Sequence, residues 1–507
     1  MHGRAARVAT EMANNSLLSA SRFAVPPSGA SGAMRRDVSA AYVAALSRIG
    51  AWAAVSAIVY RLAGPAQFGT LALIRGTIGL LNYTAAGLTP ALIRLLAEAA
   101  HTRRPRSNTP ADIRKQSDDT SSLAPDIALP KTVEYASLAD PPSEQILYSN
   151  GIAVARASVA VGLVLAVLYA VLFNHLHAVP SAIRWQAPWA VLLIGLGTLL
   201  RLYSDAPGAV LQTRGRIALD SYLLAGTDAF WAVATIALFR WPGVLTASLT
   251  YACAAALLVM MRSLAVARLD DSPWPPRLAL AQRAIVRRLL SFGFLVLLSQ
   301  LAEYFYSPTD YILINHFFGP AAVAGYAPAM QIDSGLLMLV TGLSAVLLPR
   351  AALAHTRGAR ELLGQYYLRG TAACTALLLL AAIAVWALSP WLFRLWFGPR
   401  PPDTRPILLL VLASTVIGGS SAVGRSVLLG MGKFKPYAIA AIVAGVVNVI
   451  ASYCFVKYAG LGLRGIIYGT LLVVVGRCGV WMPWYVMYAL RREESALGFP
   501  NRSSSGL

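Results

Sequence analysis

The feature that most constrains this chain is a helical hairpin pattern that occurs twice. Residues 59–97 hold an apolar run, a short turn at Gly64 and a second apolar run. Residues 314–353 repeat this order with Gly319 in the turn, and a proline follows each of the two glycines. Two apolar helices joined by a tight Gly-Pro turn are typical of a membrane hairpin. We therefore expect two related halves.

The composition indicates a membrane protein with many spans. The 507 residues are 57% hydrophobic and 13% charged, whereas soluble proteins carry about 25% charged residues. Continuous apolar runs near the length of a membrane span predict helices and exclude a β-barrel, whose strands alternate. The net charge of +21 is explained by loop arginines that set membrane topology, so we expect no nucleic-acid partner.

The apolar runs predict an all-α polytopic membrane protein of about twelve transmembrane helices in two repeated six-helix lobes. Because six spans is an even number, both halves have the same orientation. The expected spans are 39–60, 69–97, 149–173, 187–212, 217–240, 244–267, 287–317, 321–349, 366–393, 404–429, 436–457 and 464–489.

Loop charges predict the sidedness of the chain. Basic residues gather before the first span and after each even-numbered span, so both termini are expected on the cytoplasmic side. The expected divisions are a disordered tail (1–38), an N-lobe (39–267) with a disordered cytoplasmic insertion (101–149), a cytoplasmic linker (268–286), a C-lobe (287–490) and a C-terminal tail (491–507). Met34 is an alternative start.

Three stretches resemble the polysaccharide transporter family, the O-antigen-type flippases of the MOP exporter superfamily. They are RLAGPAQFGTLAL with GLTPALIRLLAE, then DYILINHFFGPAAVAGYAPAMQI with SAVLLPR, and finally LLGMGKFKPYAIAAIVAGVVNVIASYCFVKYAGLGLRGIIYGT. The resemblance implies a MATE-like fold with two lobes around a central cavity, in the bacterial inner membrane. It also implies transport of undecaprenyl-pyrophosphate-linked oligosaccharide, such as an O-antigen or exopolysaccharide repeat unit, by alternating access.

Arginines within the expected spans are candidates for binding the pyrophosphate headgroup. A charge at the centre of a membrane helix costs about 2.5–3.5 kcal/mol on insertion scales, so such residues have a function or a partner. The planar guanidinium stays charged when desolvated and binds phosphate through two hydrogen bonds. The alternative is a structural arginine that reaches the interface or forms a salt bridge. The candidates are Arg48, Arg75, Arg477, Arg156, Arg201 and Arg425.

Two acidic residues within the spans are candidates for a coupling site. Glu303 and Asp310 are seven residues apart and share a helix face, so they are candidates for binding a coupling cation, with partnership to an arginine as the alternative. Arg201 and Asp205 are four apart and are expected to pair. We expect no metal site and no cofactor, and the sequence leaves the energy source open, with an H⁺ or Na⁺ gradient as a candidate.

Two prolines are candidate hinges for alternating access. Pro308 and Pro328 lie within the second hairpin, where a proline interrupts the hydrogen bonding of a helix. Static curvature is the alternative explanation.

The leading hypothesis is a flippase for lipid-linked oligosaccharide, a transporter and not an enzyme. The alternatives are a MATE-type drug or cation antiporter, a membrane glycosyltransferase of polysaccharide assembly, and a scaffold that binds the lipid without moving it. Several in-span arginines favour an anionic substrate over a cationic drug. Expected partners are the lipid-linked oligosaccharide, membrane lipids and other polysaccharide-assembly proteins.

Overall fold

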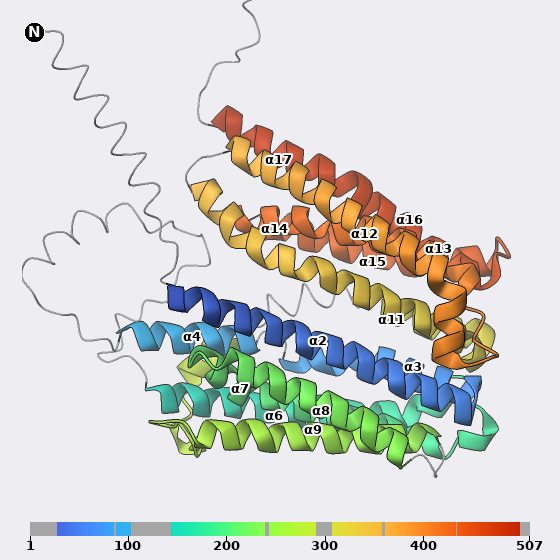
Figure 1. The fold of residues 1–507 in the computed structure, drawn as a ribbon, viewed down its shortest axis with the longest axis horizontal. Coiled ribbons are helices and arrows are strands. Elements are labelled where there is room, and N and C mark those ends of the chain that lie inside the picture. The colour runs from blue at the N-terminus through green and yellow to red at the C-terminus, as the bar shows by residue number, and fades with distance from the viewer. Residues whose placement is uncertain are drawn as a thin grey trace, which may run out of the picture.

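The computed structural model describes residues 28–85, 88–102, 143–238, 243–290, 307–356, 360–431 and 433–496. Regular secondary structure in these ranges is helical, without a strand. The helices form two groups that follow one another in the chain, one coloured blue to green and the other yellow to red (Figure 1). The chain is therefore an all-α protein, as predicted.

We call the first group the N-lobe and the second the C-lobe. The N-lobe contains α2 (Ser28–Ala63), α3 (Pro65–Ile78), η1 (Gly79–Ala85), α4 (Leu88–Thr102), α6 (Glu144–Leu176), η3 (Ser181–Ile183), α7 (Gln186–Thr213), α8 (Ile217–Ala237) and α9 (Gly243–Ala267). The C-lobe contains α11 (Ser307–Thr356), α12 (Arg360–Phe397), α13 (Arg405–Ser420), α14 (Ala422–Gly430), α15 (Phe434–Lys457), α16 (Gly462–Val474), η5 (Val475–Trp481) and α17 (Met482–Ala496). Between the lobes lies η4 (Leu278–Leu280).

Nine helices in the described ranges are long and apolar enough to cross a membrane. Each of the twelve expected spans coincides at least in part with a helix. The nine candidate spans are three fewer than the twelve expected, and the difference arises at three places. The segment 69–97 is broken, α8 carries two aspartates that lower its hydropathy, and one candidate span runs through the turn of the second hairpin.

The outer faces of the helices are apolar, which is expected of a protein surrounded by lipid. On α6 the side chains of Val164 and Val171 are 68% and 67% exposed, whereas Gly162, Ala166 and Ala170 are buried. Small residues inside and large apolar residues outside reverse the pattern of a soluble helix, because lipid replaces water at the surface. This pattern supports the predicted membrane class.

Both Gly-Pro turns adopt the same backbone conformation. The φ and ψ angles are 87° and 170° at Gly64, and 78° and 179° at Gly319. Positive φ favours glycine because it has no Cβ, and Pro65 then begins α3 with a φ suited to a helix. The repeated motif therefore marks equivalent turns in the two lobes. We call the end of the bundle that carries both turns the hairpin end.

The second half of the first hairpin differs from the expected single helix over 69–97. Helix α3 ends at Ile78, the 3₁₀ segment η1 follows, and α4 begins at Leu88. Two glycines, Gly76 and Gly79, lie at this junction, and glycine is a poor helix former. The break places the last turn of α3 next to a cavity described below.

Several expected boundaries shift. Helix α2 begins at Ser28, so residues 28–38 are helical rather than part of a disordered tail. The edges of the expected insertion are also helical, because α4 continues to Thr102 and α6 begins at Glu144, capped by the Ser143 hydroxyl. Helix α17 likewise extends to Ala496. Residues 1–27, 103–142 and 497–507 lie outside the described ranges.

The linker between the lobes is anchored to the start of α6. The buried side chain of Asn150 accepts a hydrogen bond from the Gln282 amide at 2.8 Å and donates to the Leu280 carbonyl at 3.3 Å. The Ser149 hydroxyl accepts from the Arg277 amide at 3.0 Å. This part of the linker is therefore tied to the N-lobe.

The lobes meet closely at the hairpin end. A Cβ atom on Gly69 would lie 1.7 Å from the Pro320 carbonyl oxygen, so α3 and α11 touch backbone to backbone. The Trp396 indole donates to the Ala53 carbonyl at 2.8 Å, and Tyr60 packs edge-on against Phe397 with ring centroids 5.1 Å apart. Figure 1 shows α2 and α3 lying beside α11 in this region. We call this set of contacts the hairpin-end closure.

A second set of contacts seals the same end. The Asn315 side chain on α11 accepts from the Ala178 amide at 2.9 Å and donates to the Ala178 carbonyl at 3.0 Å. The adjacent His177 is buried and lies 2.9 Å from the Tyr169 hydroxyl. The loop after α6 is therefore attached to the C-lobe.

The candidate hinges lie on α11. Pro308 is the second residue of the helix, and the preceding residues 291–306 lie outside the described ranges. Pro328 lies within α11, whose only residue with non-helical dihedral angles is Gly319. The structural interruption is thus at the Gly-Pro turn, and a hinge role for the prolines stays a prediction.

Candidate functional site

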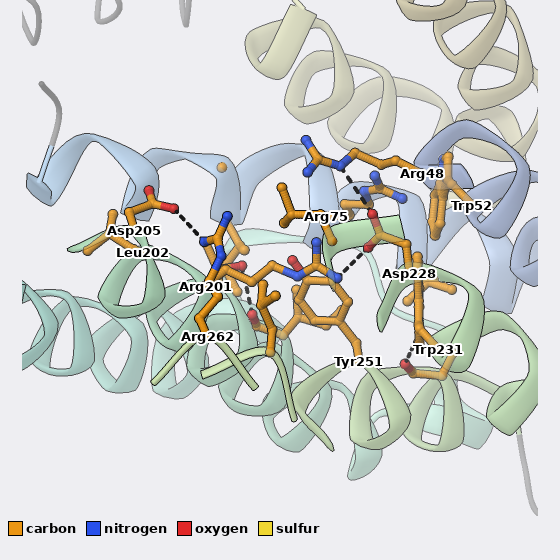
Figure 2. A pocket seen from close by; sticks show the side chains of 18 residues that line it. Arg48, Trp52, Arg75, Arg201, Leu202, Asp205, Asp228, Trp231, Tyr251 and Arg262 are labelled. Carbon is orange, nitrogen blue, oxygen red and sulfur yellow. Dashed lines mark hydrogen bonds and ion pairs between the residues drawn. The ribbon is translucent and has the colours of Figure 1, made fainter. Parts of the chain in front are cut away.

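A cavity of about 320 Å³ lies inside the N-lobe, bordered by α2, α3, η1, α7, α8 and α9. Its volume lies at the lower end of the range for ligand pockets, about 300–1,000 Å³. Cationic and aromatic side chains dominate its polar lining (Figure 2). The polar and aromatic lining residues are Arg48, Trp52, Arg75, Thr198, Arg201, Asp205, Asp228, Trp231, Tyr251 and Arg262.

Helical spacing explains why these side chains converge. Arg48 and Trp52 are four residues apart on α2, so both lie on one face. The same rule brings Arg75 and its neighbours Leu71 and Ile78 to one face of α3, at separations of four and three residues. The cavity is thus lined by single faces of packed helices.

Arg75 is the cation in this cavity that lacks an acidic partner among the described residues. Its guanidinium carbon lies 4.0 Å from the ring centroid of Trp52 and 5.7 Å from that of Trp231. The two indole rings are stacked with centroids 5.8 Å apart. The buried Nη1 atom of Arg75 has no hydrogen-bond partner within the described part of the chain. Aromatic faces hold the guanidinium and leave a donor for a ligand.

Asp228 on α8 connects two other arginines. One carboxylate oxygen accepts from Nη2 of Arg201 on α7, and the other lies 3.4 Å from Nε of Arg48 on α2. Figure 2 shows the carboxylate linked to both groups. The Asp228 side chain is 2% exposed and that of Arg48 is 48% exposed, so Arg48 stands at the open side of the cavity.

Arg262 forms a separate buried network. Its Nε donates to Asp220 at 2.7 Å, and its Nη1 donates to the Ser204 hydroxyl at 2.9 Å and to Asp205 at 3.3 Å. Gln212 also donates to Asp220 at 2.9 Å. Because this guanidinium is paired and 3% exposed, it holds α7, α8 and α9 together.

The expected pair between Arg201 and Asp205 is wrong. Arg201 bonds to Asp228, and Asp205 bonds to Arg262. A pair at i, i+4 on one helix contributes only about 0.2–0.5 kcal/mol, whereas charge-assisted hydrogen bonds between packed helices are stronger. The i, i+4 spacing identified two charged neighbours on one helix, but it does not show which residue on another helix each of them binds.

Three of the six candidate arginines lie in this cavity and three do not. Arg48, Arg75 and Arg201 line it. Arg156 is exposed on α6, and the remaining two lie in the C-lobe, Arg425 on α14 and Arg477 in the π-helical segment η5. The guanidinium of Arg477 lies 5.9 Å from the ring of Tyr437. The arginine cluster is therefore a feature of the N-lobe, not of a cavity shared equally by the lobes.

The C-lobe holds one of the two candidate cation ligands. Asp310 on α11 is 1% exposed and accepts hydrogen bonds from Tyr326 at 3.1 Å, Asn448 at 3.4 Å and Thr470 at 2.8 Å. These donors are neutral, so the carboxylate is hydrogen-bonded but lacks an ion pair within the described residues. Among the described residues, Asp310 therefore lacks the arginine partner that was the alternative to cation binding. Glu303 lies outside the described residues.

Sequence reasoning missed Arg262 and the aromatic part of the cavity. Arg262 lies within the expected span 244–267, so the rule that flags charges inside spans would have found it. Trp52 and Trp231 had no such signal, because tryptophan is common in membrane helices and only the packing of α2 against α8 brings these two together.

Two family sequence models match parts of this chain. The sequence model of the family described as MatE matches residues 296–454, and the one described as Polysaccharide biosynthesis protein matches residues 227–355. A search of curated proteins found no match.

Solved structures that resemble the chain include MATE transporters. An inward-facing multidrug resistance MATE family transporter of the MOP superfamily gives a TM-score of 0.66 at 15% identity, covering 89% of this chain and 99% of that chain. An outward-facing structure of a multidrug resistance MATE family transporter gives a TM-score of 0.57 at 16% identity, and the match covers 91% of this chain and 96% of that chain. A structure of MATE in complex with MaD3S gives a TM-score of 0.55 at 17% identity, and the match covers 91% of this chain and 96% of that chain.

The fold and the apolar helices define the class first: the chain is an all-α, multi-pass membrane protein with the MATE fold. Two family models match shorter parts of the chain, MatE over residues 296–454 and Polysaccharide biosynthesis protein over residues 227–355, in agreement with the resemblance found in the sequence.

Proposed function

We propose that the protein is a flippase that moves undecaprenyl-pyrophosphate-linked oligosaccharide across the bacterial inner membrane by alternating access. The pyrophosphate is bound in the N-lobe cavity by Arg75, Arg48 and Arg201. Both termini lie on the cytoplasmic side, and the hairpin end faces the periplasm. The glycan is an O-antigen or exopolysaccharide repeat unit.

The observation that carries this proposal is the state of Arg75. A buried guanidinium whose Nη1 has no partner among the described residues is costly unless a ligand completes it. A phosphate oxygen is a suitable acceptor, since guanidinium and phosphate form charge-assisted hydrogen bonds. The match to a polysaccharide biosynthesis model over residues 227–355 supports the glycan part of the substrate.

The contacts between the lobes support transport by alternating access. The hairpin-end closure joins α2 and α3 to α11 and α12, as in the bond from Trp396 to Ala53. Arg48, which stands at the open side of the cavity, is fifteen residues before the last residue of α2, Ala63. At about 1.5 Å per residue this places it roughly 22 Å from the hairpin end. A headgroup therefore enters from the opposite end while the hairpin end is closed.

Asp310 supplies the coupling site in this proposal. Hydroxyl and amide side chains surround a buried carboxylate, and such groups coordinate Na⁺ or stabilise a bound proton. Cation binding there is proposed to favour one arrangement of the C-lobe helices α11, α15 and α16. The driving force is then an Na⁺ or H⁺ gradient, with no further cofactor.

Complementation tests the function. We delete the gene in its host and express wild type, Arg75→Ala or Arg156→Ala at matched membrane levels. Arg156 is the control because it is an in-span arginine outside the cavity. We expect wild type and Arg156→Ala to restore surface polysaccharide, and Arg75→Ala to leave lipid-linked precursor on the cytoplasmic side. Normal surface polysaccharide in the deletion strain would contradict the proposal.

A MATE-type drug or cation antiporter is the second candidate. It is favoured by the solved structures, which include multidrug resistance transporters, and by the acids Asp205 and Asp228 in the cavity. The same deletion strain discriminates between the two: a changed drug-resistance profile with unaltered surface glycan supports the antiporter.

A further inference from the structure

Asp228 occupies the place where an anionic ligand would bind. Its two carboxylate oxygens each meet a different arginine, Arg201 from α7 and Arg48 from α2. The side chain is 2% exposed, and it borders the cavity together with both arginines. In the structure the carboxylate thus forms ion pairs with these two guanidinium groups, as phosphate oxygens would.

The charges of the cavity show which cations are already neutralised. Arg262 is paired with Asp220 and Asp205, and Arg48 and Arg201 share Asp228. Four arginines against three aspartates leave one positive charge, and Arg75 is the guanidinium without an acid among the described residues. A headgroup with two phosphates can bind Arg75 with one phosphate, and must compete with Asp228 to bind the other two arginines.

Resting on the proposed function, we propose that Asp228 is an internal competitor of the transported pyrophosphate, which holds Arg48 and Arg201 in the empty cavity and speeds release of the ligand. As phosphate oxygens enter, they replace the carboxylate at one or both arginines. As the ligand leaves, the carboxylate binds them again. A transporter needs this balance, because a site that binds too tightly does not release.

The competitor role has a physical basis in the burial of Asp228. A carboxylate at 2% exposure that loses its cations carries a large desolvation penalty. This penalty opposes ligand binding and is recovered when the ligand departs. Removing the charge while keeping the shape should therefore tighten binding, the opposite of the result expected for a residue that contacts the ligand favourably.

The test compares purified wild type with Asp228→Asn, Asp228→Glu and Asp205→Asn. The probe is farnesyl pyrophosphate, and its binding and dissociation are followed by tryptophan fluorescence, since Trp52 lies against Arg75. Asp205→Asn is the matched control, because it removes one cavity charge that is paired with Arg262 instead.

We expect Asp228→Asn to bind the probe about tenfold more tightly or better, mostly through slower dissociation, and to transport more slowly. Asp228→Glu should keep wild-type affinity, and Asp205→Asn should change it less. Tighter binding also predicts that the probe raises the melting temperature of Asp228→Asn more than that of wild type, so the variant remains informative even if it is less stable.

Two results would overturn these ideas separately. If wild type binds the probe and Arg75→Ala does not, but Asp228→Asn binds no more tightly than wild type, the competitor role fails and the proposed function stands. If wild type itself does not bind farnesyl pyrophosphate, the proposed function fails, and the role of Asp228 with it.

Discussion

The closest contact between the lobes offers a sharp test of the hairpin-end closure. We consider the substitution Gly69→Ala on α3. Its added Cβ would lie 1.7 Å from the Pro320 carbonyl oxygen and 2.7 Å from the carbonyl carbon, both backbone atoms that have no rotamer to change. The two helices must therefore separate before the alanine fits.

The size of the effect follows from this overlap. Ordinary contact begins near 3.4 Å, so α3 and α11 must move apart by about 1.7 Å (3.4 minus 1.7). Overpacking of this kind costs about 1–3 kcal/mol. Because the penalty applies only while the lobes are closed, it shifts the population away from closure by about 5- to 150-fold. The matched control is Gly50→Ala, where nothing lies within 4 Å of the added Cβ.

A cysteine reporter measures this shift. In a variant without its native cysteines, Ser56→Cys places a thiol at a position that is 0% exposed in the closed hairpin end. Gly69→Ala should raise the rate of maleimide labelling by the factor above, and Gly50→Ala should not. The reasoning is refuted if Gly69→Ala inserts and folds normally but labels at the control rate.

Three further predictions concern other sites. Arg262→Ala leaves Asp220 buried without its cation and should destabilise the protein by about 3–5 kcal/mol, seen as a lower melting temperature, and an unchanged melting temperature would show that the network is dispensable. Beyond the end of α6, burial and the charge of His316 lower the pKa of His177 to about 4, with Tyr169 as its other titratable neighbour. An exposed histidine has a pKa of about 6.5, so the closure should be at full strength above that pH and weaken as pH falls towards 4. Because maleimide reacts with the thiolate, the labelling rate of the same reporter is divided at each pH by its rate in the unfolded protein. This ratio should rise as pH falls over the window, and a flat ratio would contradict the prediction. Asp310→Asn should abolish the dependence of transport on an Na⁺ or H⁺ gradient and leave probe affinity unchanged, whereas a retained gradient dependence would remove Asp310 from the coupling mechanism.

The fold could be predicted largely from the sequence because its strongest signals are local. Apolar runs near the length of a bilayer predict membrane helices. The repeated Gly-Pro motif predicts the two turns, and the structure shows positive φ at Gly64 and Gly319 in them. The break after Ile78 was missed because a glycine within an apolar run does not show whether the helix continues or ends.

The site was predicted only in part because its partners come from distant segments. A charge inside a span identified Arg48, Arg75 and Arg201 as candidates. The same reasoning also selected Arg156, which lies outside the cavity, since the direction of a side chain depends on packing between helices. That Asp228 rather than Asp205 binds Arg201 depends on the packing of α8 against α2 and α7, which no sequence spacing reveals.

Transport by the purified protein is the decisive measurement for the proposed flippase function. Vesicles with an imposed Na⁺ or H⁺ gradient are prepared with a lipid-pyrophosphate-linked oligosaccharide in both leaflets, and an impermeant glycosidase outside cleaves the sugar that reaches the outer leaflet. Wild type and Arg156→Ala should permit cleavage beyond the outer-leaflet share, and Arg75→Ala should not. Cleavage limited to the outer leaflet with wild type, or equal cleavage with Arg75→Ala, would contradict the account.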